Sequence, residues 1–195
     1  MFIIKRIKNE VNTYGIIEAI LIVKSYIFWK IFNYLKLLII GVKLGKGIIF
    51  EGIVRVSGGK RVTIGDNAKI GRGVVLDAGK NGKIEIGCNT YVGMNTIIIA
   101  NSEVKIGSNC LISPFCYIID TNHGTALGES ICNQSYISLP VIIGDDVWLG
   151  THCVILKGVK LGDGVVIGAG GIANKSISEN MVAVGVPARP IKTRK

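Results

Sequence analysis

The chain has 195 residues, enough for one domain with at most a short appendage. Its 23 lysine and arginine residues outnumber 13 acidic residues, which gives a net charge of +10, and 49% of all residues are hydrophobic. The excess positive charge lies at the two ends, in residues 1–46 and 189–195, and the body between them is neutral. A neutral body without a basic stripe argues against nucleic-acid binding, and it leaves an acidic lipid surface or a polyphosphate cofactor as partners for the basic ends.

Residues 1–41 predict an N-terminal helical segment. Its apolar stretch runs to Ile40, with charges at intervals and Gly15 as the only glycine. No uncharged run here reaches the roughly 18–20 residues that span a bilayer. From Ser25 onward a helical wheel separates polar from large apolar side chains, and a shorter helix is expected at about 11–22. The polar side holds Ser25, Lys30, Asn33 and Lys36, and the apolar side holds Ile27, Phe28, Ile31, Phe32, Leu35 and Leu38.

Two roles fit this amphipathic segment. Lysines beside Tyr26, Trp29 and Tyr34 suit the headgroup region of a bilayer, which predicts a peripheral membrane contact at the inner face of the cell membrane for a cytoplasmic protein. The alternative is a helix that caps the open end of the following domain or packs within an oligomer. A secretory signal is not expected, because no convincing small-residue cleavage site follows the apolar run.

A step of six residues organises the chain from Ile143 to Ala173. A large aliphatic residue stands at positions 143, 149, 155, 161 and 167, with alanine at 173, and glycine follows at 144, 150, 162 and 168. Neither a helix nor a half-buried strand has this period, whereas a unit of one short strand and one corner does. Three such units form an 18-residue turn of a parallel β-solenoid, in which the repeated aliphatic position lies in the core.

The solenoid is predicted to cover residues 42–192. The anchors Ile64, Ile86 and Ile106 are spaced by 22 and 20 residues, which predicts small corner additions at about 79–85 and 103–105. Residues 124–141 break the repeat and predict a functional insertion loop directly after His123.

The prolines and cysteines add two expectations. Pro187 and Pro190 are expected to end regular structure, and residues 193–195 to form a basic tail. The odd count of five cysteines, with no C-x-x-C pair, predicts reduced thiols packed mostly as small hydrophobic residues. With only His123 and His152 available, no metal site is expected.

The repeat resembles the hexapeptide of left-handed parallel β-helix acyltransferases, in which Leu, Ile or Val precedes Gly. The segments PVIIGDDVWLG from Pro140, IGAG from Ile167 and VGVPARP from Val184 are similar to the galactoside, maltose and polysaccharide O-acetyltransferase branch. The resemblance implies an all-β, left-handed parallel β-helix, a homotrimer with active sites between neighbouring prisms, and acetyl-CoA as the co-substrate.

The resemblance also implies site residues. The catalytic histidine of the family precedes a loop that interrupts the coil, which is His123 here, and histidine suits a general base near neutral pH. Asp120 could orient it, and His152 is the secondary candidate for the base. The implied cofactor-binding residues are Thr151, Ala169, Asn174, Lys175, Arg189 and Lys192, of which Asn174 departs from the threonine of the family. The implied acceptor-side residues are Asn95 and Trp148.

These features predict an acetyl-CoA-dependent O-acetyltransferase that acts on a sugar hydroxyl, in surface polysaccharide biosynthesis. N-acetylation of a nucleotide-linked amino sugar and O-acetylation of serine are alternatives, because nothing in residues 124–141 names the acceptor. A γ-type carbonic anhydrase would need three histidines, and the chain has two. A non-catalytic solenoid scaffold is the alternative outside enzymes.

Overall fold

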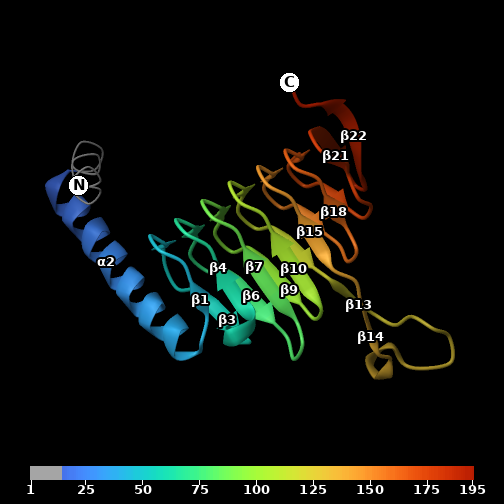
Figure 1. Ribbon diagram of the computed structural model, residues 1–195, viewed down its shortest axis with the longest axis horizontal. Helices are drawn as coiled ribbons and strands as arrows, with labels where there is room; N and C mark the ends of the chain where they lie inside the picture. Colours follow the sequence, from blue (N-terminus) through green and yellow to red (C-terminus); the bar gives the residue numbers. More distant parts are fainter. Residues whose placement is uncertain (1–14) are drawn as a thin grey trace.

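The computed structural model describes residues 15–195, and these form a three-sided coil of parallel strands with one long helix at its first turn (Figure 1). Each side of the coil is a sheet whose strands come from successive turns, so the pairings between turns are parallel, and the last strand of one side pairs antiparallel. Sheet A contains β1 (Lys43–Leu44), β4 (Val62–Ile64), β7 (Lys83–Ile86), β10 (Glu103–Ile106), β15 (Val141–Ile143) and β18 (Lys160–Leu161).

The other two sides follow the same arrangement. Sheet B contains β2 (Ile49–Phe50), β5 (Lys69–Ile70), β8 (Tyr91–Val92), β11 (Leu111–Ile112), β16 (Trp148–Leu149), β19 (Val166–Ile167), β21 (Met181–Gly185) and β22 (Ala188–Thr193). Sheet C contains β3 (Arg55–Ser57), β6 (Val75–Ala78), β9 (Ile97–Ala100), β12 (Tyr117–Ile119), β17 (Val154–Ile155) and β20 (Ile172–Ala173). The chain therefore visits A, B and C in turn and bends at three corners, here called A–B, B–C and C–A. A short 3-10 helix, η1 (Gly59–Arg61), lies in the first C–A corner.

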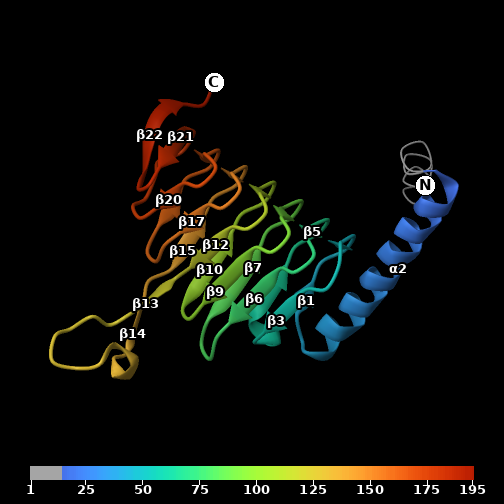
Figure 2. The ribbon, with the colours of Figure 1, turned by 180° about the vertical axis from the view of Figure 1, so that it is seen from behind.

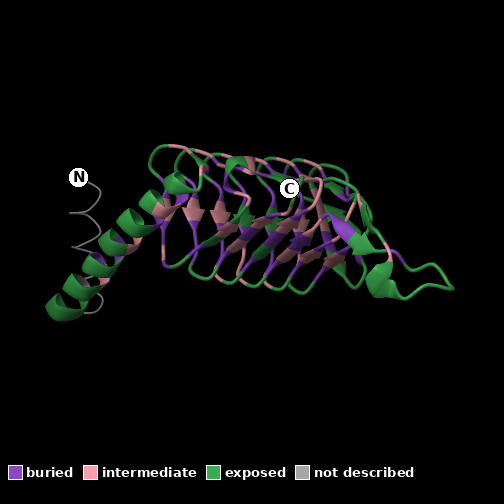
Figure 3. Ribbon diagram, turned by 90° about the horizontal axis from the view of Figure 1, so that it is seen from below, coloured by how far each residue is buried: buried purple, intermediate pink, exposed green. Residues whose placement is uncertain are grey.

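The predicted stacking of the aliphatic position is confirmed. Ile86, Ile106, Ile143 and Leu161 follow one another across sheet A and are almost fully buried, and Figure 3 shows this buried interior along the whole coil. The glycine after the aliphatic residue allows the turns to approach closely. A Cβ on Gly150 would lie 2.5 Å from the amide nitrogen of the next turn, which no side chain can tolerate.

The prediction of corner additions at about 79–85 and 103–105 is correct only in part. The extra residues lie at the C–A corner, where residues 79–82 follow β6 and residues 101–102 follow β9. Residues 83–85 and 103–105, which the spacing had included, are instead the first residues of β7 and β10. Counting between anchors gives the surplus length but not its position within the turn.

Helix α2 (Ile16–Ile39) is one continuous helix, so the prediction of a separate helix at about 11–22 is wrong over the described residues 16–22. Residues 11–14 of that prediction lie outside the described chain. The helix packs against the first turn through Asn33 and Leu37, both fully buried. No helix in residues 15–195 meets both the length and the hydropathy that crossing a membrane requires.

The end of the coil also differs from expectation. Strand β22 runs antiparallel to β21 through Pro190, although the prolines were expected to end regular structure. Because β22 is the edge strand of sheet B, Pro190 need not donate to a further strand, and a register shift at Val182 and Ala183 accommodates it. The expected basic tail is also partly ordered, since Thr193 ends β22 and Arg194 forms a 2.7 Å ion pair with Asp146.

Native protein is expected to expose two of its five thiols to a water-soluble disulfide reagent. Cys88 and Cys132 are exposed, whereas Cys110, Cys116 and Cys153 are buried in the coil. Burial raises the pKa of the Cys110 thiol, which suppresses the reactive thiolate further. Titration with Ellman's reagent before and after unfolding in guanidinium measures this, and fast reaction of more than two thiols in the native state would contradict the packing.

Candidate active site

His123 lies at the root of the one long excursion from the coil within residues 42–195. The chain leaves β12, forms β13 (Thr121–His123), loops through the 3-10 helix η2 (Ile131–Asn133), and returns as β14 (Tyr136–Ser138) before re-entering sheet A (Figures 1 and 2). Strands β13 and β14 pair antiparallel, with His123 opposite Tyr136. The imidazole is exposed, and its centre lies 4.6 Å from that of the Tyr136 ring. The hairpin therefore presents a supported imidazole to solvent.

The loop beyond the hairpin is organised by one side chain, Gln134. Its Nε2 donates to the carbonyls of Ala126 and Glu129, at 2.9 Å each, and its Oε1 accepts from the amide of Ala126 at 2.8 Å. Gly124 donates to the carbonyl of Ser135 at 3.1 Å, which closes the hairpin next to His123. These bonds give the exposed loop a defined shape near the imidazole.

The suggested role of Asp120 in orienting His123 is not supported by its contacts. Asp120 is fully buried, and its carboxylate accepts three backbone hydrogen bonds at 2.7–2.8 Å from the amides of Asn101, Ser102 and Glu103. Both oxygens are therefore used by the turn below. Asp120 instead fixes the place where the loop leaves the coil, and its own carbonyl accepts from Leu139 as the chain returns.

Thr151 and Ala169, 18 residues apart in sequence, lie on successive turns of the B–C corner. The carbonyl of Thr151 accepts a 2.8 Å hydrogen bond from Gly170, which aligns the two turns. Within residues 15–195, the amide N–H groups of Thr151 and Ala169 have no hydrogen-bond acceptor. Two stacked, unpaired donors at one corner form a site for the carbonyl oxygens of an extended ligand.

The A–B corner shows that unpaired amides are not inherent in this coil. At the equivalent position after the glycine, aspartate side chains of the next turn accept the amide hydrogens of three turns. Asp66 accepts from Lys46 at 2.8 Å, Asp145 accepts from Ser108 at 2.7 Å, and Asp163 accepts from Asp145 at 2.8 Å. The B–C corner has Arg72, Met94, Pro114, Thr151 and Ala169 at this position, and none of them carries a carboxylate. The amides of Thr151 and Ala169 at the B–C corner therefore stay free, whereas the amides of Lys46, Ser108 and Asp145 at the A–B corner are paired.

Trp148 and His152 flank the unpaired amide of Thr151. Trp148 projects from sheet B with 49% of its surface exposed, and its indole N–H donates to Ser113 Oγ at 3.3 Å. The hydroxyl of Thr151 donates to the Pro114 carbonyl at 2.8 Å, and its oxygen lies 3.0 Å from Nδ1 of His152. The imidazole of His152 stacks on the ring of Phe115, with 5.1 Å between the ring centres. His152 therefore belongs to the B–C corner, away from the loop root.

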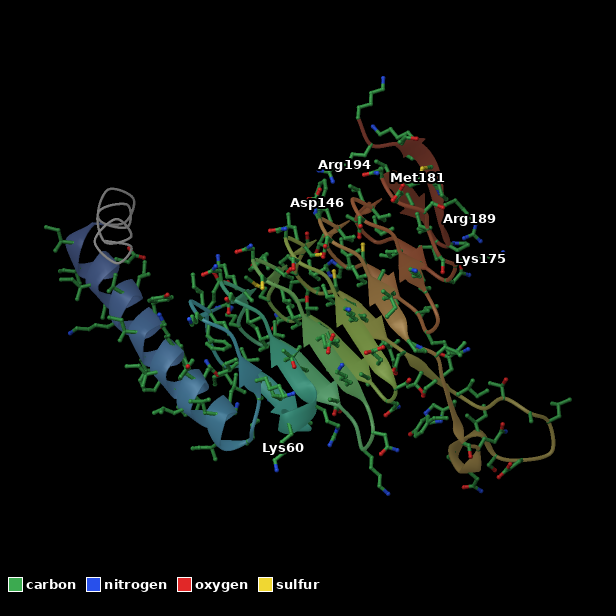
Figure 4. The ribbon with its side chains drawn as sticks, in the orientation of Figure 1. Lys60, Asp146, Lys175, Met181, Arg189 and Arg194 are labelled. Carbon is green, nitrogen blue, oxygen red and sulfur yellow. The ribbon has the colours of Figure 1, made fainter. Side chains whose placement is uncertain are left out.

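Asn174 and Arg189 come together at the last turn of the coil. The guanidinium of Arg189 donates to Asn174 Oδ1 at 3.2 Å and to its neighbouring backbone carbonyl at 2.9 Å. Figure 4 shows Lys175 beside Arg189 on the same margin of the molecule. Lys192 lies farther along β22, where it lines a separate hollow with Val182, Thr193, Arg194 and Lys195. Of the predicted cofactor-binding residues at this end of the coil, Asn174, Lys175 and Arg189 thus lie together, and Lys192 lies apart.

Asn95 occupies the B–C corner two turns before Thr151, in a left-handed conformation with φ of 55°. The same conformation occurs at Asn67, Asn89 and Asn109, so the backbone geometry alone explains an asparagine there. Across residues 15–195 no group of three or more His, Cys, Asp or Glu side chains is arranged to hold a metal ion.

One chain does not bring all of the predicted residues together. His123, Asn174 and Lys175 lie at the C–A corner, whereas Thr151, Ala169, Trp148 and Asn95 lie at or beside the B–C corner, across the width of sheet C. The sequence reading missed Tyr136 and Phe115, the ring partners of the two histidines. Only their place on an irregular loop and at a corner could have indicated them.

Comparisons with known proteins agree with this architecture. Residues 140–171 match the family described as bacterial transferase hexapeptide (six repeats), and residues 61–78 match the hexapeptide repeat of succinyl-transferase. The chain is 42% identical over 130 residues to galactoside O-acetyltransferase of Escherichia coli (strain K12), which covers 67% of this chain and 63% of that protein.

Two further matches extend the likeness. The chain is 36% identical over 139 residues to the E. coli (strain K12) protein named "Putative lipopolysaccharide biosynthesis O-acetyl transferase WbbJ", covering 67% of this chain and 71% of that one. The solved structure of galactoside acetyltransferase in complex with coenzyme A superposes with a TM-score of 0.59 at 34% identity, covering 78% of this chain and 65% of that one. Together with the three-sided coil and its hexapeptide matches, these likenesses show that the chain belongs to the hexapeptide-repeat, left-handed parallel β-helix acyltransferase family, in its galactoside, maltose and polysaccharide O-acetyltransferase branch.

Proposed function

We propose that the protein is an acetyl-CoA-dependent O-acetyltransferase that acts on a sugar hydroxyl in surface polysaccharide biosynthesis. The observation that carries the proposal is the pair of stacked, unpaired amides at Thr151 and Ala169, which fits the amide and thioester carbonyls of an extended pantetheine arm. Arg189 and Lys175 at the end of the coil supply positive charge for the nucleotide phosphates. The named relatives act on galactosides and in lipopolysaccharide biosynthesis, which supports a sugar as acceptor.

The proposed reaction is direct transfer in a ternary complex. His123 accepts the proton of the acceptor hydroxyl as its oxygen attacks the thioester carbonyl carbon. The negative charge that develops on the carbonyl oxygen faces a backbone N–H at the B–C corner. Collapse of the tetrahedral intermediate breaks the carbon–sulfur bond, and the departing CoA thiolate takes the proton from His123. The products are the acetylated sugar and CoA.

We propose a homotrimer, because the outer surfaces of the three sheets differ in chemistry. The outward column of sheet A is mainly polar: Lys43, Thr63, Glu85, Lys105, Ile142 and Lys160. The columns of sheets B and C are mainly apolar and include Tyr91, Leu111, Trp148 and Val166 on B, and Val75, Ile97, Tyr117, Val154 and Ile172 on C. Two apolar sides and one polar side suit a prism with neighbours on two sides.

A trimer would also complete the proposed site. The C–A corner of one prism, with His123, could meet the B–C corner of its neighbour, with Thr151 and Ala169. Each active site would then use residues from two subunits.

Release of CoA thiol from acetyl-CoA, measured against a panel of mono- and oligosaccharides, tests the function. Transfer to a sugar is expected, with a product heavier by one acetyl group whose position follows from mass spectrometry and NMR. An acetylated amine or serine would favour the alternative acceptors. Absence of thiol release with every acceptor, despite CoA binding, would favour the scaffold alternative.

We place the protein in the cytoplasm, at the inner face of the membrane, where it would reach a lipid-linked glycan.

A further inference from the structure

Helix α2 is docked with part of its polar side, Asn33 and Lys36, toward the protein. Asn33, which the helical wheel places on the polar side, is fully buried between the helix and the first turn of the coil. Its Nδ2 donates to the carbonyl of Gly52 at 2.7 Å, and its Oδ1 accepts from the amide of Val54 at 3.3 Å. Lys36 Nζ donates to the carbonyl of Val54 at 2.7 Å. Side chains of the predicted polar stripe thus anchor the helix.

The opposite side of the helix is therefore left apolar and exposed. A surface helix usually buries its apolar stripe and presents charge to water. Helix α2 instead buries Asn33 together with Val23, Tyr26 and Leu37, and it leaves a broader apolar side exposed. Figure 3 shows exposure along almost the whole helix. The exposed large hydrophobic side chains, each 39–85% accessible, are Ile16, Ile17, Ile20, Leu21, Ile27, Phe28, Ile31, Phe32, Tyr34, Leu35, Leu38 and Ile39. A continuous apolar face of this length marks a contact with another phase or partner.

The charges around this face are mainly positive, because the exposed Lys24 and Lys30 of α2 outnumber its one exposed acid, Glu18. Lys24 lies within it, one helical turn from Ile20 and Phe28, and is exposed. At the same end of the coil Lys43, Lys46 and Lys60 are exposed, and Figure 4 shows Lys60 near the end of the helix. Residues 1–46 together carry eight basic and two acidic residues. An apolar face within a basic region complements an anionic lipid surface.

We propose that the outward face of α2 lies in the headgroup region of an anionic lipid bilayer, with the helix parallel to the membrane plane. Lys24 separates this occupant from a second copy of the chain. In the core of a protein interface its ammonium group would lose hydration without a partner, and lysine is depleted there. At a lipid surface the long side chain can reach the phosphates while its methylenes stay in the apolar layer. Lipid contact through α2 does not depend on the acetyl-transfer chemistry, and it would give the protein a partner besides the sugar and acetyl-CoA.

Flotation of the full-length protein with vesicles tests the proposal. Vesicles of phosphatidylcholine with phosphatidylglycerol should carry the protein, and pure phosphatidylcholine should carry much less. The double variant Phe28→Ser/Leu35→Ser, whose side chains are 58% and 56% exposed, should lower binding about tenfold or more. Leu127→Ser, fully exposed on the distant loop, is the matched apolar control and should bind as wild type.

Charge variants complete the design. Lys24→Glu should weaken binding to the anionic vesicles, and Lys195→Glu, at the other basic end, should weaken it much less. Binding that depends equally on Leu127 or on Lys195 would overturn the proposal. Absence of vesicle binding by the wild-type protein would overturn it too. In that case, a change of oligomeric state in Phe28→Ser/Leu35→Ser, measured by light scattering, would show that a second copy of the chain covers the face. Acetyl transfer to a soluble sugar is expected to survive in these helix variants, whereas His123→Ala should lose transfer and keep vesicle binding, so the two proposals fail separately.

Discussion

Replacing His123 with alanine is expected to lower kcat for acetyl transfer by about 10²–10⁴, the usual contribution of a positioned general base. The physical reason is that a sugar hydroxyl holds its proton at neutral pH and attacks the thioester poorly without a base. His123 is exposed and lies on a paired hairpin, so alanine removes the imidazole without opening a cavity in the coil. Initial rates of CoA release with saturating sugar and acetyl-CoA measure the effect.

Two controls make the result specific. Binding of CoA by the His123→Ala variant, measured by calorimetry, should stay close to wild type, because the unpaired amides of Thr151 and Ala169 lie at another corner. His152→Ala is the comparison for the second histidine, whose ring stacks on Phe115 and contacts the hydroxyl of Thr151 through Nδ1. A larger loss of kcat in His152→Ala than in His123→Ala would move the base to the B–C corner.

Regular repetition made the coil predictable, and irregular contacts limited the rest. The step of six from Ile143 to Ala173 specifies strands, corners and a stacked core, because each turn meets only its neighbours. Helix α2 shows the limit. Its wheel separated polar from apolar residues correctly, but the wheel cannot say which side meets the coil. That choice depended on the free carbonyl of Gly52 and amide of Val54, which Asn33 satisfies from a distance of about 20 residues in sequence.

Part of the candidate site was also predictable from the repeat, and part was not. Positions set by the repeat, such as Thr151 and Ala169, could be paired from their spacing alone. The role of Asp120 could not, because three amides one turn below determine it and the sequence shows only an acid near a histidine. The repeat therefore predicts which residues share a corner, whereas the partners of a buried polar side chain are known only from the structure.

The second large effect is expected at Asp120, where alanine should destabilise the fold by about 2–4 kcal/mol. A hydrogen bond to a charged group contributes about 1.5–3 kcal/mol, and three bonds that share one carboxylate are not additive. Removing them leaves the amides of Asn101, Ser102 and Glu103 unpaired beneath the loop root. A loss of this size is a large share of the roughly 5–15 kcal/mol that stabilises a typical domain. The midpoint of guanidinium unfolding measures it.

Asp163→Ala is the matched control, because its carboxylate accepts a single amide, from Asp145, at an exposed corner. Its cost should stay below about 1 kcal/mol, since solvent can replace that one bond. Asp120→Asn keeps the shape of the side chain but has one acceptor oxygen fewer. Its unfolding midpoint should therefore fall between those of wild type and Asp120→Ala.

The pH dependence of kcat shows whether Asp120 anchors the loop or orients His123. If Asp120 only anchors the loop, Asp120→Asn lowers the stability of the fold but does not move the fall of kcat at low pH. A shift of that fall, with stability unchanged, would show instead that the carboxylate acts on His123.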